Sequence, residues 1–389
     1  MGKSRKSFLV LAAVWVASLI CSLQADTAGT QPAQMATEDR FQLPGWWPTK
    51  GTASREQFVG PDACAPCHAS KVQTQKRTPM ANASTHAAES EVLRSHDQLT
   101  FHLPPYTYQI TRTENGSFYS VTNGAHTISA PLGWAFGLGE SGQTYVFERN
   151  GTFYESRVSY YRAVDGLDFT PGAPRTASPT LEDALGRRML YAPETHRCFG
   201  CHTTAASTNS RFDPNRLIPG VTCEACHGPG ATHVAMMKTG QKEEGIASIM
   251  NPGRLNAIDL VDFCGACHRT FMDVALSHTL GLANLRFQPY RLERSQCWRK
   301  SEARVTCLTC HDPHEPRVRD LAAYDDKCLS CHRSATDSHS TDDHRGKACT
   351  VSKNNCVTCH MPKYDMPGMH FKFTDHFIRV VRKDEPYSD

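Results

Sequence analysis

Seven copies of one pattern, Cys-x-x-Cys-His, recur along this 389-residue chain and constrain its fold more than any other feature. With two cysteines in each copy, they use 14 of the 17 cysteines. The pattern predicts covalent attachment of c-type haem, in which the cysteines form thioethers and the histidine binds the iron. The seven predicted sites are Cys64, Cys67 and His68; Cys198, Cys201 and His202; Cys223, Cys226 and His227; Cys264, Cys267 and His268; Cys307, Cys310 and His311; Cys328, Cys331 and His332; and Cys356, Cys359 and His360.

Other uses of paired cysteines explain the pattern less well. A zinc site usually takes two such pairs and does not require a histidine directly after each of them. A dithiol oxidoreductase needs one motif rather than seven. Disulfides would use the cysteines but leave the seven adjacent histidines unexplained. We therefore predict seven covalently bound c-type haems as the cofactors of this chain.

The first 25 residues resemble a secretory signal peptide. Lys3, Arg5 and Lys6 precede an apolar run over 8–23, and Ala25 offers a cleavage position. The apolar run is short for a membrane span, so we expect no span in the mature chain. Because c-type haem is attached outside the bacterial cytoplasm, the sequence predicts a periplasmic or extracellular protein.

The charge balance argues against a nucleic-acid partner. The chain has 42 basic and 39 acidic residues, and removing the three cations of the predicted signal leaves 39 of each. The propionates of the predicted haems would then make the loaded protein acidic, which disfavours binding to a polyanion. Only 39% of the residues are hydrophobic, so we expect the porphyrins to form much of the interior.

The spacing of the motifs divides the chain into unequal parts. We predict a signal peptide over 1–25, a linker over 26–57, a first haem segment over 58–97, an antiparallel β insertion over 98–163 and a six-haem core over 164–389. Asn-Gly pairs at 115–116, 123–124 and 150–151 separate alternating runs, which is a strong hairpin signal. Ser178-Pro179 is typical of a helix start, and we expect a helix from there to Arg188.

These observations predict a mainly α-helical and irregular multihaem cytochrome c fold, built around packed haems. The antiparallel β insertion between the first and second motifs is expected to be small. The last six motifs fall within 163 residues, from Cys198 to His360, which leaves room only for short helices and loops. Cys297 and Cys349 lie outside the motifs, and in an oxidising compartment such a pair favours a disulfide over two free thiols.

The ligand on the second face of each iron decides its chemistry. A second protein ligand gives a low-spin centre suited to electron transfer, whereas an open face allows a small molecule to bind. Eight side chains are candidates for the seven second positions, so every iron could be closed. They are Met80, His196, His233, His278, His314, His344, His370 and His376.

The order of several segments resembles exported multihaem cytochromes c. The segments are 59–80, Tyr160-Tyr161 with Thr170-Pro171-Gly172, 197–202, 223–233, 307–314, 356–363 and 373–376. The chain is similar to the tetrahaem cytochrome c of ammonia oxidisers, within the wider nitrite reductase and hydroxylamine oxidoreductase superfamily. The resemblance implies closely packed haem pairs and implies that His233, His314 and His376 are distal ligands. It would be a heptahaem type without the tetratricopeptide repeats of many relatives, and the absence of Cys-x-x-Cys-Lys disfavours a nitrite reductase.

Three functions stay open at this point. The first is an electron carrier, with no catalytic residues, that exchanges electrons with unidentified redox partner proteins. The second is an oxidoreductase that acts on a small nitrogen or sulfur compound at one five-coordinate haem. The third is a subunit of a polymeric haem wire.

Overall fold

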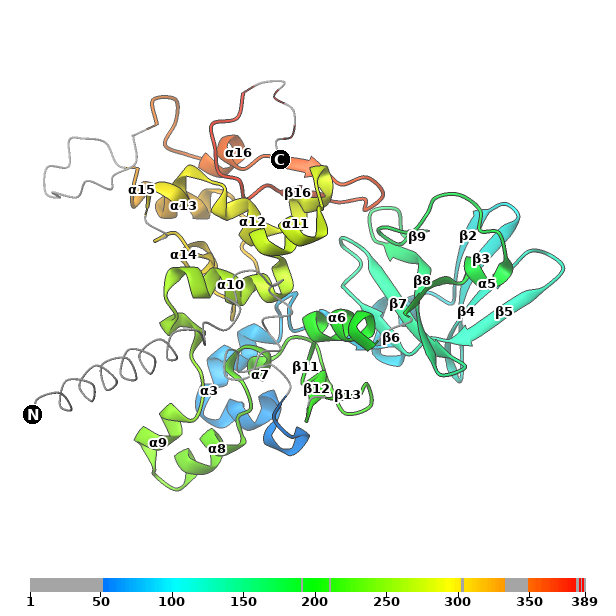
Figure 1. Ribbon diagram of the computed structural model, residues 1–389, viewed down its shortest axis with the longest axis horizontal. Coiled ribbons are helices and arrows are strands. Elements are labelled where there is room, and N and C mark those ends of the chain that lie inside the picture. Colours follow the sequence, from blue (N-terminus) through cyan, green and yellow to red (C-terminus); the bar gives the residue numbers. More distant parts are fainter. Residues whose placement is uncertain are drawn as a thin grey trace, which may run out of the picture.

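The computed structural model describes residues 52–189, 192–209, 211–301, 304–332, 349–382, 385 and 387. The predicted signal peptide and most of the predicted linker lie outside these residues. None of the described helices is long and apolar enough to cross a bilayer. The described chain consists of a β region and a column of short helices, which lie side by side in Figure 1.

The β region contains two antiparallel sheets. One sheet has the order β2-β3-β4-β5, and the other has the order β1-β6-β7-β8-β10, with β9 also paired to β8. The strands are β1 (Ser84–His86), β2 (Gln98–Leu103), β3 (Tyr106–Thr113), β4 (Gly116–Thr122), β5 (Thr127–Pro131), β6 (Trp134–Phe136), β7 (Gln143–Arg149), β8 (Thr152–Tyr161), β9 (Gly166–Phe169) and β10 (Gly186–Met189).

The β region has a hydrophobic core of its own. Tyr108 and Ile110 on β3 are buried opposite Val121 and Tyr119 on β4. Side chains from the second sheet, including Tyr145 and Val158, complete one continuous cluster. The alternation of buried and partly exposed residues along β3 and β4 is the pattern of strands with one face toward a core.

The prediction of a mainly α fold with a small β insertion is wrong. A large antiparallel region spans residues 84–169, and the helices of the haem-rich part follow it. The three Asn-Gly hairpins are confirmed, since they join β3 to β4, β4 to β5 and β7 to β8. The region is larger than expected because β1, β2, β6, β9 and β10 add strands that carry no Asn-Gly signal.

The helix expected from Ser178 to Arg188 is also wrong. Helix α5 covers only Leu181–Ala184, with Thr180 as its N-cap. Gly186 then has a φ of 142°, and β10 pairs with β8 as an edge strand. The helical segment ends because this backbone conformation favours glycine and cannot continue an α-helix.

The helical part forms a column that carries the haem motifs (Figure 1). Helix α3, near one end, contacts α7, while α10 contacts α6, α12 and α14, and α15 contacts α16. The helices are α3 (Pro61–Gln75), α4 (Glu91–Ser95, in the β region), α6 (Ala192–His202), α7 (Cys223–His227), α8 (Ala231–Lys238), α9 (Lys242–Ala247), α10 (Ala257–His268), α11 (Phe271–Ser277), α12 (Gln288–Glu293), α13 (Gln296–Lys300), α14 (Cys307–Cys310), α15 (Asp325–Leu329) and α16 (Cys356–His360).

Small two-stranded sheets complete the helical part. They pair β11 (Thr203–Thr204) with β14 (Ile218–Pro219), β12 (Ser207–Thr208) with β13 (Arg211–Phe212), and β15 (Lys363–Asp365) with β16 (Lys372–Thr374). The apolar clusters here are small, and one of them contains only Phe263 and Ala266 as buried members. A column with so little side-chain core is consistent with an interior completed by porphyrins.

Polar contacts join the β region to the column. Glu140 pairs with Arg319 at 2.5 Å, and Asp168 lies 2.8 Å from His370. Ser84 donates to the carbonyl oxygen of His202 at 2.7 Å. The β region is therefore anchored to the segments that carry the second, fifth and seventh motifs.

Candidate haem sites

Three motif histidines face a second histidine from a distant part of the chain. The ring centroids of His68 and His233 are 6.5 Å apart with planes 25° from parallel. Those of His227 and His314 are 6.0 Å apart at 22°, and those of His311 and His376 are 6.3 Å apart at 43°.

These separations suit two imidazoles on opposite faces of one iron. Because a metal–imidazole bond is about 2 Å long and a ring centre lies about 1 Å beyond its nitrogen, such rings have centroids about 6 Å apart. Zinc fits the site less well, since no group of three or more His, Cys, Asp or Glu side chains in the described residues could hold a metal ion. The three pairs therefore fit axial ligation of haem.

The pairs form an interlocking series. The partner of the first motif, His233, follows the third motif, and the partner of the third, His314, follows the fifth. The partner of the fifth, His376, follows the seventh. The histidines of the first, third and fifth motifs are thus each paired with a histidine from the segment that follows the next odd-numbered motif.

Hydrogen bonds fix the orientation of several of these rings. Nδ1 of His227 lies 2.7 Å from the carbonyl oxygen of Met250, and Nδ1 of His233 lies 2.7 Å from that of Gly245. His360 has the same type of bond to Arg379 at 2.8 Å, and His376 to Thr374 at 3.1 Å. A bond at Nδ1 leaves Nε2 as the metal-binding nitrogen and sets the plane of the ring.

Burial keeps these imidazoles neutral. It lowers the pKa of His202, His227, His268 and His311 below the usual histidine value, and it lowers the pKa of His376 to about 4. The neutral imidazole is the form that binds a metal. These sites are therefore ready for ligation at neutral pH without first losing a proton.

The motif cysteines lie close together along the column. The thiol of Cys64 lies close to that of Cys223, the thiol of Cys264 to that of Cys307, and the thiol of Cys328 to that of Cys356. Cys226 lies near Cys264, and Cys310 near Cys328. The motifs therefore follow one another in space in the order first, third, fourth, fifth, sixth and seventh.

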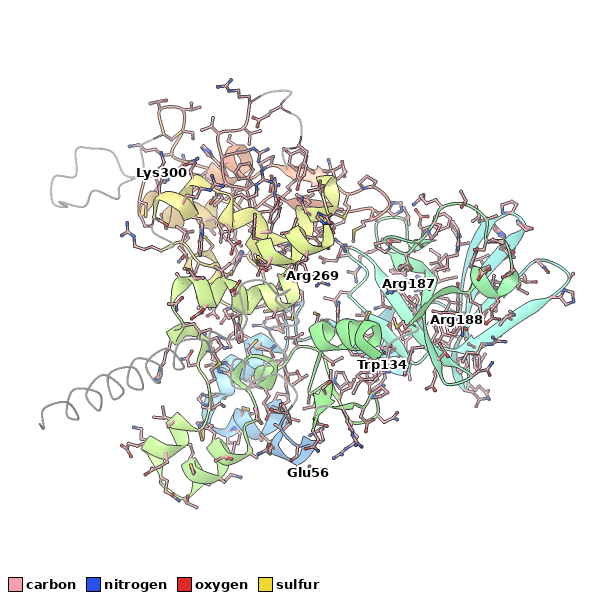
Figure 2. The ribbon with its side chains drawn as sticks, viewed as in Figure 1. Glu56, Trp134, Arg187, Arg188, Arg269 and Lys300 are labelled. Carbon is pink, nitrogen blue, oxygen red and sulfur yellow. The ribbon has the colours of Figure 1, made fainter. Side chains whose placement is uncertain are left out.

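The second motif lies between the column and the β region. Cys201 lies 3.8 Å from the carbonyl oxygen of Ala266 in the fourth motif. On the other side, the Phe199 ring packs edge-on against Trp134 and Phe136 of β6. Figure 2 shows Trp134 where β6 meets α6. The second motif thus packs against the face of this sheet that carries the side chains of Trp134 and Phe136.

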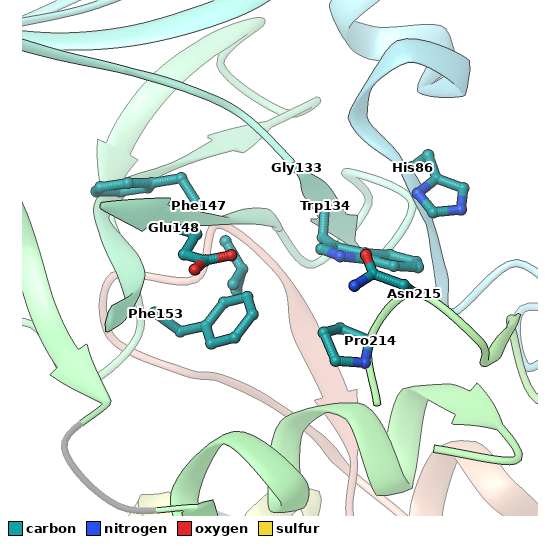
Figure 3. A pocket seen from close by; sticks show the side chains of 9 residues that line it. His86, Gly133, Trp134, Phe147, Glu148, Phe153, Pro214 and Asn215 are labelled. Carbon is teal, nitrogen blue, oxygen red and sulfur yellow. The ribbon is translucent and has the colours of Figure 1, made fainter. Parts of the chain in front are cut away.

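A small pocket opens beside this face of the sheet. It has a volume of about 230 Å³, and its lining includes Trp134, Phe153, Glu148 and Asn215 (Figure 3). The ring of His86 lies over Trp134 with centroids 4.1 Å apart. The pocket lies among side chains that pack near Phe199, outside the three histidine pairs.

Of the remaining predicted ligands, the three whose side chains the structure describes, Met80, His278 and His370, lie in no such pair. His370 is engaged through Nε2 with Asp168 and lies edge-on to Tyr161, while His278 is exposed at the end of α11. Met80 is half-buried, and its backbone carbonyl accepts from the N–H groups of Ala83 and Val221. His344 and the side chain of His196 lie outside the described residues. Their predicted roles remain predictions.

The structure has no disulfide between Cys297 and Cys349. Both are free thiols; Cys349 is exposed and accepts from the backbone N–H groups of Val351 and Ser352. Cys297 instead lies near Cys331 of the sixth motif. The sequence favoured a disulfide because it shows only that two cysteines are left over, not which side chains lie beside each of them in the fold.

Two buried carboxylates position the haem segments, and sequence reasoning missed both. Glu224, inside the third motif and 1% exposed, accepts from the N–H groups of Val59, Gly60 and Gly230. It ties the start of α3 to the turn that leads to His233. Asp375, which is fully buried, binds Arg291 at 2.8 Å beside His376. The only available signal was the position of each acid next to a motif cysteine or a candidate ligand.

Comparison with a protein-family model supports a cytochrome assignment. Residues 178–228 match the family described as "Cytochrome c554 and c-prime". Among solved structures, the outer cell wall cytochrome OcwA matches with a TM-score of 0.48 and 15% sequence identity, over 84% of this chain and 80% of that one. No curated protein matches the chain. The family match spans the second and third motifs, and with the repeated motif it identifies the chain as a multihaem c-type cytochrome.

Proposed function

We propose that this multihaem c-type cytochrome holds seven haems in a closely spaced series and transfers electrons along it outside the cytoplasm. Each bound haem supplies a one-electron iron centre. The observation that carries the proposal is the interlocking set of three histidine pairs, since closed axial sites favour electron transfer over substrate binding. The contacts between motif cysteines support close spacing of neighbouring sites.

The residues of the chain have three roles in this proposal. Cys64, Cys223 and their equivalents in each motif attach the haems and fix their spacing. His233, His314 and His376 close the second faces at the first, third and fifth sites. Backbone carbonyls and buried carboxylates orient these ligands, which tunes the basicity of each imidazole and so the potential of the iron.

The compartment and the partners of the protein follow from the chemistry of haem attachment and from its charge. Export across the cytoplasmic membrane supplies the compartment where c-type haem is attached, and the apolar run over 8–23 supports it. The donor and acceptor would be redox proteins or surfaces rather than nucleic acid, because the loaded protein is acidic.

A ferric-state spectrum of the exported, haem-loaded protein tests this function. We expect low-spin signals to dominate the paramagnetic resonance spectrum, with at least three haems that do not bind carbon monoxide after reduction. A predominantly high-spin spectrum, with every haem open to carbon monoxide, would overturn the proposal.

One observation favours a second candidate, an oxidoreductase that acts at the second haem site. Among the described side chains, the aromatic ring in contact with His202 is that of Phe136, edge-on with centroids 5.3 Å apart, rather than a second imidazole. An open face there would accept a small ligand. A single high-spin haem whose signal changes on adding nitrite or hydroxylamine would support this candidate.

A further inference from the structure

A buried ionic cluster lies beside the last of the three histidine pairs. Arg291 on α12 holds Asp375 through two parallel bonds, Nε to Oδ1 at 2.8 Å and Nη2 to Oδ2 at 2.9 Å. Arg379 adds a bond from Nη1 to the same Oδ2 at 2.9 Å. Both Arg291 and Asp375 are 0% exposed, and the side chain of Arg379 is 9% exposed. These three residues are called the ionic cluster below.

Aromatic rings enclose the ionic cluster. The guanidinium of Arg291 lies 4.5 Å from the ring centre of Tyr387 and 5.2 Å from that of Phe377. Arg379 lies 5.0 Å from the same Phe377 ring and donates to the hydroxyl of Tyr364. Two cations share one carboxylate in a site from which water is largely excluded, so their geometry is strongly constrained.

The ionic cluster contacts two haem-ligand segments at once. Asp375 directly precedes His376, and its Oδ1 accepts from the N–H of Phe377 directly after that ligand. Arg379 presents its carbonyl oxygen to Nδ1 of His360, the motif histidine of the seventh site, at 2.8 Å. The segment 375–379 therefore joins the second ligand of the fifth site to the first ligand of the seventh.

Burial of such ions is costly, and a well-packed apolar group in their place is often equally stable. A buried ionic group can instead fix one conformation among several. The angle between the His311 and His376 rings, 43°, differs from the 22° and 25° of the other pairs. The His376 ring, which lies beside the ionic cluster, is thus tilted more from its partner ring than the rings of the other two pairs are.

We propose that the ionic cluster of Arg291, Asp375 and Arg379 is a positioning device shared by two haem sites. It sets the plane of His376 opposite His311 and fixes the carbonyl that orients His360. This inference rests on the proposed function, in which His376 is an axial ligand. Asp375 and Arg379 are positioning residues, since they act on the irons only through the two histidines.

Electron paramagnetic resonance of the haem-loaded protein tests the proposal, because the low-spin ferric signal depends on the angle between the two axial imidazole planes. The variants are Asp375→Asn and Arg379→Gln. Arg294→Gln is the matched control, since it removes the same charge from the same Phe377 ring, at 5.3 Å, and the Arg294 guanidinium donates to the hydroxyl of Tyr290.

Both variants are expected to keep the full haem content and to shift the largest-g feature of one haem, while the midpoint potentials of two haems change. Arg294→Gln is expected to leave the spectrum as it is in the parent protein. If Asp375→Asn does not accumulate, Arg379→Gln carries the test, because it keeps Arg291 paired with Asp375. Unchanged spectra and potentials in Arg379→Gln, or equal changes in the control, would overturn the proposal.

A fourth variant, His376→Ala, separates this inference from the proposed function. If His376 is an axial ligand, the variant converts one low-spin haem to high spin. Without that conversion, the ligand assignment itself fails. If the conversion occurs but Asp375→Asn and Arg379→Gln leave the spectrum unchanged, only the positioning role is lost.

Discussion

His233, His314 and His376 each follow one haem motif but face the histidine of an earlier one. This arrangement makes each proposed second ligand a link between two parts of the column. A substitution at one of these histidines should therefore open a single iron and leave the attachment of the haem intact, since the thioethers and the motif histidine remain.

Replacing any one of His233, His314 or His376 by alanine is expected to give one high-spin haem that binds carbon monoxide after reduction. The control is His126→Ala, which changes an exposed histidine of the β region. Optical spectra of the reduced protein with and without carbon monoxide measure the effect. If all three variants keep every haem low-spin, the ligand assignment is contradicted.

Glu224 gives a second test at the residue scale. Glutamine in its place keeps one oxygen but turns an NH₂ group toward one of the three backbone N–H donors, so one buried donor loses its acceptor. We expect Glu224→Gln to lower the free energy of unfolding of the haem-loaded protein by about 2 kcal/mol. Chemical denaturation measures it, with the exposed Glu243→Gln as control. Equal stability of the two variants would contradict the role of Glu224.

At the scale of elements, the edge strand β10 replaces the end of an expected helix. Gly186 permits the change: with φ at 142°, an added Cβ would lie 2.0 Å from the carbonyl oxygen of Glu155. The strand therefore depends on a residue without a side chain.

Gly186→Ala is expected to destabilise the β region by about 2 to 3 kcal/mol, because it adds both backbone strain and a clash. Gly133→Ala is the control, since its Cβ would meet the carbonyl oxygen of Val146 at an ordinary 3.6 Å. Thermal unfolding followed by circular dichroism compares the two. A Gly186→Ala variant as stable as Gly133→Ala would show that β10 tolerates a side chain there.

The elements that sequence reasoning predicted correctly are those with local signals. The Asn-Gly turns and alternating runs placed β3, β4, β7 and β8 well, because hairpin pairing is encoded within a few residues. Short strands such as β1 and β6 carry no such signal and are set by their partners in the sheet. His233, His314 and His376 could be proposed as ligands from their positions near motifs, but the histidines that they face are defined only by the fold.

At the scale of the whole molecule, the two parts differ in what fills their interiors. The β region has a continuous core that includes Tyr119, Phe147 and Leu185. Among the described residues of the column, the apolar clusters are small. The stability of the column should therefore depend on its haems, whereas that of the β region should not.

Haem-free chain is expected to keep the β region folded while the column is lost. Limited proteolysis followed by mass spectrometry should recover a protected fragment close to residues 84–189 from cytoplasmic, haem-free material. Haem-loaded protein provides the control and should be protected over both parts. Uniform digestion of the haem-free chain would contradict an independent β region.

Covalent haem at all seven motifs is the claim on which the functional proposals depend. The mass of the intact exported protein, combined with haem quantification as the pyridine haemochrome, measures it directly. We expect the polypeptide mass plus seven haems, with seven haem equivalents per chain. A bare polypeptide mass, or far fewer than seven equivalents, would contradict it.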